Sequence, residues 1–151
     1  MTNQELFDEC VGHVLRQGRP GADHPSGYLG CMYKTPQGNC CTVGGPLVKR
    51  GLYREEMEFN SVSEVLFETA DLTMGENLLR DALTAWGVKP NQIPLLKDIQ
   101  RSHDAAAKMT GHDTDDVIFI AAFKDKAHRV AIAHELNALV FDTFNAGEPA
   151  C

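Results

Sequence analysis

The sequence lacks several features that would place the chain in a specialised class of protein. No apolar run approaches the roughly 18 residues that a membrane-spanning helix needs. Lys and Arg together number 14 against 21 Asp and Glu, which leaves a formal net charge of −7. This balance argues against direct nucleic-acid binding, because nucleic-acid surfaces are built on clusters of positive charge. The first residues also lack the basic and apolar regions of a signal peptide.

Motifs for common chemistries are missing as well. The chain contains no Gly-x-Gly-x-x-Gly or Walker loop and no Gly-x-Ser-x-Gly turn, so no cofactor is predicted. Its 5 cysteines include no Cys-x-x-Cys pair, and an odd number without that spacing does not describe a secreted disulfide framework. Together these absences predict a cytoplasmic protein with reduced thiols and no membrane contact.

What is present is the composition of a globular domain, with 43% hydrophobic and 23% charged residues. A chain of this length is expected to form a single domain over residues 1–151, with a frayed tail at 145–151. The residue pattern predicts an α+β fold that is mainly helical, with five to six helices packed on one antiparallel β-hairpin at about residues 31–44.

The hairpin prediction depends on turn residues between two short runs that favour strands. Pro36 suits the second position of a β-turn, and Gly38 can adopt a positive φ. A three-residue loop with these residues would pair Lys34 with Cys40 across the two strands.

The register of this hairpin decides which of two adjacent cysteines is accessible. The three-residue loop directs Cys31, Tyr33 and Cys41 to the core and leaves Cys40 accessible. A four-residue loop would instead place Cys40 beside Cys31 and Tyr33, with Met32 and Cys41 on the other face, because a slip of one residue exchanges the faces. The first register is favoured, and the second stays open.

The rest of the chain is predicted to be mainly helical. Apolar residues at helical spacing, with capping boxes at Thr2 and Ser61, predict helices at about residues 3–17, 61–70, 76–86, 93–109 and 127–144. Residues 117–123 are apolar throughout, which is typical of a buried helix or a strand, and the acidic residues before them favour a helix.

Cysteine and histidine residues are the candidates for chemistry, and each has a simpler structural explanation. A cysteine nucleophile needs a base and an electropositive, partly exposed setting, and Cys40 beside Lys34 is the strongest candidate, with His103 as the base. Cys31 and Cys41 together with His103 are the candidates for a zinc site. Because His103 falls on an apolar helix face, where hydrogen bonds normally satisfy a histidine, we predict no catalytic residues and no metal. His13 lies off the apolar stripe of its helix and is expected to be solvated.

One stretch resembles a known family. The motif is Cys31-x-Tyr33-x-x-Pro36-x-Gly38-x-x-Cys41-x-x-Gly44, followed by Leu47, Tyr53 and Glu56-Met57-Glu58. It is similar to that of an uncharacterised family of small bacterial and phage proteins, in which a helix precedes the hairpin. This chain departs from the family at Cys40, where Lys is more usual, and at Phe59, where Gly is usual. The resemblance implies a shape and no activity.

Two functions of different class remain. The favoured one is a non-enzymatic, acidic protein-binding module, encoded by a phage or mobile element, that occupies a surface of a host protein; an inhibitor of a host defence protein is one specific form. The alternative is a small thiol- or metal-dependent enzyme that uses Cys40 or Cys31 with His103. The sequence favours the non-enzyme and leaves the partner, any substrate and the oligomeric state open.

Overall fold

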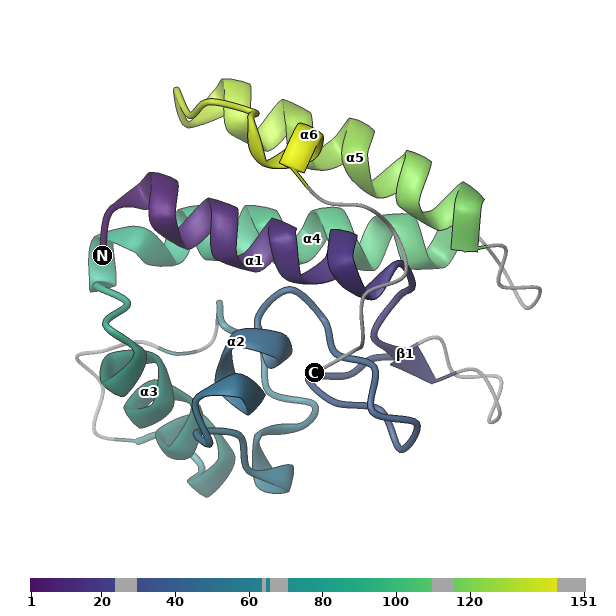
Figure 1. Ribbon diagram of the computed structural model, residues 1–151. Coiled ribbons are helices and arrows are strands. Elements are labelled where there is room, and N and C mark those ends of the chain that lie inside the picture. Colours follow the sequence, from purple (N-terminus) through teal and green to yellow (C-terminus); the bar gives the residue numbers. More distant parts are fainter. Residues whose placement is uncertain (24–29, 64, 66–70, 110–115, 144–151) are drawn as a thin grey trace.

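The computed structural model describes residues 1–23, 30–63, 65, 71–109 and 116–143, and over these residues the protein is mainly helical (Figure 1). The α-helices are α1 (Asn3–Gln17), α2 (Gly44–Lys49), α3 (Met74–Trp86), α4 (Ile93–Met109), α5 (Asp116–Ala133) and α6 (Val140–Thr143). Two 3-10 turns, η1 (Glu55–Met57) and η2 (Pro90–Gln92), and two strands, β1 (Ala22–Asp23) and β2 (Gly30–Cys31), complete the elements.

Helices α1 and α4 form the middle of the molecule. Figure 1 shows α5 and α6 on one side of this pair and α2 and α3 on the other. Helix α4 packs against both α1 and α5, and α2 packs between α1 and α3. The apolar faces of these elements meet in a hydrophobic cluster that includes the fully buried Leu6, Phe7, Leu96, Phe119 and Phe123.

Local sequence signals determine the ends of the best-predicted helices. At α1 the Thr2 hydroxyl and the Glu5 carboxylate form a reciprocal capping box, and Gly18 ends the helix with a φ of 73°. Gly87 ends α3 in the same way with a φ of 96°. The prediction of a helix over residues 93–109 is confirmed by α4.

The predicted fold class is wrong because the 31–44 hairpin does not form as a pair of strands packed on the helices. Within the described residues the only ladder pairs Ala22–Asp23 with Gly30–Cys31, two residues on each side. Lys34 and Cys40 do pair, but only as an isolated bridge. The segment then enters α2 at Gly44, where the prediction placed the end of a strand.

Side chains from outside the segment explain why no ladder extends from this bridge. The carboxylate of Glu58 accepts from the backbone N–H groups of Tyr33 at 3.0 Å and Lys34 at 2.9 Å. The Gln17 amide accepts from the Cys40 N–H at 2.8 Å and donates to the Cys40 carbonyl at 2.9 Å. Because buried backbone groups need only one set of partners, these contacts replace the cross-strand bonds of a hairpin.

The C-terminal half differs from the prediction in where its helices begin and end. Residues 117–123 are helical, as favoured, but α5 continues without a break to Ala133. The predicted helix over 127–144 is therefore wrong as a separate element. Glu135 adopts a φ of 55°, and the Leu136 N–H donates to the Ala131 carbonyl at 2.8 Å, which closes α5 before α6 begins.

Two other predictions on helices have different outcomes. Ser61 to Ser63 and Val65 lie outside any helix, and residues 64 and 66–70, like the predicted tail at 145–151, fall outside the described residues. His13, predicted to be solvated, is buried on α1 with 9% of its surface exposed. Its ring packs directly on Gly45 of α2, a contact that the amphipathic pattern of α1 alone does not reveal.

Candidate functional site

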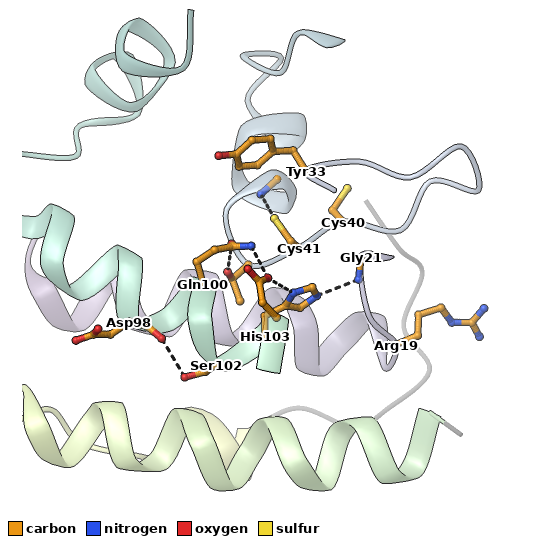
Figure 2. A network of polar contacts seen from close by, with 12 residues as sticks. Arg19, Gly21, Tyr33, Cys40, Cys41, Asp98, Gln100, Ser102 and His103 are labelled. Carbon is orange, nitrogen blue, oxygen red and sulfur yellow. Dashed lines mark hydrogen bonds and ion pairs between the residues drawn. The ribbon is translucent and has the colours of Figure 1, made fainter. Parts of the chain in front are cut away.

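A cluster of three side chains that can ligate metals lies where β2 meets α4. It consists of Cys31, His103 and Asp104, and one ligand-type atom of each lies within 4.8 Å of the others. The structure thus brings together two candidates predicted from the sequence, Cys31 and His103, with Asp104, the neighbour of His103 in the chain. Figure 2 shows the network of polar contacts around His103.

His103 is fully buried, and both of its ring nitrogens have hydrogen-bond partners. The ring packs edge-on against Phe119 and Phe123, with centroid distances of 5.6 and 6.4 Å. The backbone N–H of Gly21 donates to Nε2 of His103 at 3.0 Å. Its Nδ1 lies 3.1 Å from Oδ1 of Asp104.

The Gly21 contact determines which ring nitrogen of His103 carries the proton. A backbone N–H can only donate, so Nε2 must accept, and the neutral ring is then protonated on Nδ1 and donates to Asp104. A metal on Nδ1 would displace that proton, and the ring would need a proton on Nε2, directly opposite the Gly21 N–H. Neither nitrogen is therefore offered to a metal ion or to a thiol proton. The prediction of a buried histidine satisfied by hydrogen bonds is confirmed.

Asp104 accepts hydrogen bonds from several side chains. The Gln100 amide donates to its Oδ1 at 2.9 Å, and Gln100 in turn accepts from the Thr42 hydroxyl at 2.7 Å. Burial by itself would raise the pKa of Asp104, but the hydrogen bonds from His103, Cys31 and Gln100 hold that pKa below its usual value. The ionised carboxylate thus joins α4 to the segment that contains β2 and Thr42.

The two free thiols near Asp104 are poor nucleophiles. Cys31 and Cys41 line a pocket of about 280 Å³ together with Asp104 and Lys108. Burial, followed by the Asp104 carboxylate, raises the pKa of Cys31 far above its usual value. Burial also raises the pKa of Cys41 to about 12. A reactive cysteine needs a lowered pKa, so the arrangement favours a structural role for both.

Cys40 lies apart from this pocket. It is buried and disulfide-bonded, so the prediction of an accessible Cys40 thiol is wrong, and so is the expectation of reduced thiols at this residue. Cys10, Cys31 and Cys41 are free. The Gln17 amide, which bonds both backbone groups of Cys40, holds this residue inside the protein whatever the hairpin register.

Alkylation of the native protein at pH 7 should show this inertness. We expect Cys31 and Cys41 to react with iodoacetamide much more slowly than the same thiols in denaturant, because raised pKa values leave almost no thiolate at neutral pH. Mass spectrometry of tryptic peptides at successive times measures both rates. Rapid native labelling of Cys31 would contradict the structural assignment and support the enzyme alternative.

A second candidate site is a surface centred on Phe59, which the sequence motifs do not indicate. This side chain is 81% exposed, and its backbone has a φ of 66°. The left-handed backbone conformation costs a residue other than Gly about 1–2 kcal/mol. A bulky residue in this conformation is a genuine outlier. Gly, the residue that the sequence resemblance led us to expect at this position, would adopt a positive φ without this cost.

The residues on either side of Phe59 hold it in this conformation. Buried Glu58 bonds the backbone of Tyr33 and Lys34 and accepts from the Tyr53 hydroxyl at 3.0 Å. The Asn60 amide donates to the carbonyl oxygens of Glu56 and Glu58 at 3.2 and 3.1 Å. Tyr33 donates its hydroxyl to the Asn60 carbonyl at 2.5 Å. Phe59 is therefore directed outward by a rigid frame.

Concave surface and negative charge surround Phe59. It borders both the pocket of about 280 Å³ and a second one of about 600 Å³ that is lined by Tyr53, Glu55 and Glu56. Burial and then the carboxylates of Glu58, Glu55 and Glu56 raise the pKa of the Tyr53 hydroxyl, which reports the negative charge in this region. We call the exposed residues Glu55, Glu56 and Phe59 the Phe59 surface.

Comparison with known proteins identifies no relative of this chain. No protein-family model, no curated protein and no solved structure matches the chain. Among the described helices, none combines the length and the apolar character that crossing a membrane requires.

Proposed function

We propose that this protein is a non-enzymatic, acidic protein-binding module that contacts a host protein through the Phe59 surface. The observation that carries the proposal is the exposed side chain of Phe59 on a strained backbone, which contacts of the adjacent Glu58 and Asn60 hold in place. Strained backbone persists where the surroundings hold it, and such residues cluster at functional positions. Aromatic side chains are frequent anchors of protein interfaces, and a backbone that is already held in place loses less entropy on binding.

The charge around this anchor favours a basic partner. Glu55 and Glu56 are exposed beside Phe59, and the chain as a whole carries a formal charge of −7. We infer a partner surface with an apolar pocket for Phe59 and Lys or Arg residues at its rim. The resemblance to bacterial and phage proteins favours a host protein as this partner, with inhibition of a defence protein as one form.

Affinity capture from a bacterial host lysate, with matched variants as bait, tests the proposal. The wild-type protein and a Leu139→Ala control, altered at an exposed apolar residue on another face, should capture the same protein, and Phe59→Ala should lose it. Raising the salt concentration or replacing Glu55 and Glu56 by Gln should weaken the captured complex. If every captured protein is retained equally by Phe59→Ala, the Phe59 surface is not the binding site.

Phe59→Gly should separate binding from stability. Glycine adopts a φ near 66° freely, and an 81% exposed side chain contributes little to the core, so we expect no loss of stability and a gain of up to about 1 kcal/mol. Chemical denaturation measures this change. A clear loss of stability would show that Phe59 serves the fold rather than a partner, and Phe59→Asn, which also tolerates positive φ, is the matched control.

The enzyme alternative has one observation in its favour, the approach of Cys31 to His103 and Asp104. The engaged ring nitrogens of His103 and the raised thiol pKa weigh against it, and the alkylation experiment above decides between the two. A cytoplasmic location remains part of the proposal. The free thiols of Cys10, Cys31 and Cys41 support it, whereas a disulfide at Cys40 is a feature that a reducing compartment opposes.

A further inference from the structure

Helix α5 is apolar on a side that the fold leaves exposed. Its buried stripe, directed at the rest of the protein, consists of Phe119, Phe123, Ala127 and Ala131. On the other side Val117, Ile118 and Ile132 are 77%, 53% and 67% exposed. Large apolar side chains exposed on one side of a helix can mark an interaction site, so this side of α5 is a candidate for a second covering surface.

The exposed residues form a regular seam along α5. Ile118, Ala121, Asp125, His128 and Ile132 follow one another at alternating spacings of three and four residues, and each is exposed. This is the spacing by which one helix packs against another at a shallow angle. The seam is apolar at its two ends and charged in its middle.

We propose that two copies of this chain associate through α5, with the two helices antiparallel about a twofold axis. In this arrangement Asp125 of each copy faces His128 and Arg129 of the other, and Ile132 of each copy lies against Ala121 and Ile118 of the other. The seam is thus complementary to itself, which an isologous interface requires. The small Ala121 side chain lets the helices approach closely.

The charges in the middle of the seam favour a second copy over an unrelated partner. Within one chain Arg129 and Asp125 form an ion pair of 3.2 Å, with their side chains 78% and 63% exposed. Such an exposed pair contributes little to stability by itself. Across the twofold axis the same two residues form an alternating network of four charges, which fixes the register of the two helices.

This interface is separate from the Phe59 surface. Figure 1 shows α5 on the side of α1 and α4 away from α2 and α3, and η1, which precedes Phe59, packs against α3. A dimer formed through α5 therefore presents two Phe59 surfaces, one from each copy.

Sedimentation equilibrium of the full chain over a range of concentrations tests the proposal. We expect a reversible monomer–dimer equilibrium, with Ile118→Lys/Ile132→Lys raising the dissociation constant by roughly tenfold or more, since apolar contacts at the seam are lost. Asp125→Arg alone should also favour the monomer, and Asp125→Arg combined with Arg129→Asp should restore the dimer because the opposite charges meet again.

Met74→Lys is the matched control, because Met74 is an apolar residue on α3 that is 69% exposed. It should leave the dissociation constant unchanged. Circular dichroism confirms that each variant is folded before its mass is interpreted. A wild-type protein that is monomeric at every concentration would overturn the proposal, and so would a dimer that is insensitive to the Ile118 and Ile132 substitutions.

Discussion

Gly44→Ala should destabilise the protein by about 3 kcal/mol or more, the range of severe overpacking. A Cβ built at Gly44 falls well inside van der Waals contact with the backbone of Tyr33, including its carbonyl oxygen. Backbone atoms cannot rotate away as a flexible side chain can. The Ala variant must therefore separate the first turn of α2 from the segment that contains Tyr33, where Glu58 accepts from the backbone N–H groups of Tyr33 and Lys34.

Equilibrium unfolding in urea measures the effect, and Gly51→Ala is the matched control. Gly51 has a φ of 67°, and a Cβ added there has nothing within 4 Å. Gly51→Ala should therefore lower the free energy of unfolding only by the strain of a left-handed Ala, about 1 kcal/mol. If Gly44→Ala unfolds no more easily than Gly51→Ala, the close approach of Gly44 to Tyr33 is wrong. The result bears on the sequence motif, because this approach explains why a Gly stands at the end of the Cys-x-x-Gly pattern.

Acid should destabilise the protein through His13. Burial, followed by the positive charge of Arg16, lowers the pKa of this imidazole from 6.5 to about 4, whereas the contacts with the Cys40 carbonyl and Gln17 oppose the shift and His103 adds to it. Nε2 of His13 has no hydrogen-bond partner among the described residues. The folded protein therefore favours the neutral ring, which packs on Gly45.

The direction of the pH effect follows from this lowered pKa. Above pH 6.5 the ring is neutral in both states; below it the unfolded chain takes up a proton that the folded protein accepts only near pH 4. The contribution of neutral His13 to stability is thus fully present above pH 6.5. It decreases as the pH falls below 6.5 and is lost once the pH has passed about 4. The total loss from this residue is about 3 kcal/mol.

Urea unfolding at several values between pH 7 and pH 4 measures this loss in the wild type and in His13→Gln. We expect the Gln variant, which cannot titrate, to have a smaller pH dependence over this range than the wild type. Other acid-sensitive groups such as Asp104 contribute equally to both proteins and cancel. Parallel curves for wild type and His13→Gln would show that His13 is solvated after all.

The candidate site divides into residues that the sequence located and residues that it did not. His103 was placed correctly on a buried helix face because helical periodicity alone determines the facing of a side chain. The contacts of its ring with Gly21 and Asp104 were not predicted. Gly21 contributes a backbone group, which no residue type can signal, and an adjacent pair such as His103-Asp104 arises too often by chance to indicate a site.

The hairpin error has a similar origin. Pro36 and Gly38 do make a turn, and the Gly38 N–H donates to the Thr35 carbonyl at 2.9 Å. The turn residues could not reveal that Glu58 and Gln17 would take the backbone groups on either side. At Phe59 the sequence resemblance indicated an unusual residue in place of Gly. Only the structure, with a φ of 66° at this position, shows that the unusual residue strains the backbone.

By itself the sequence determined where α1, α3 and α4 begin or end and which of their faces are buried, because caps and periodicity act over a few neighbouring residues. The tertiary structure alone decided which buried backbone groups are bonded by side chains, whether Cys40 is accessible, and how α5 is left apolar on an exposed side. These outcomes depend on contacts between residues far apart in the chain, where burial and competition for hydrogen bonds outweigh local preference.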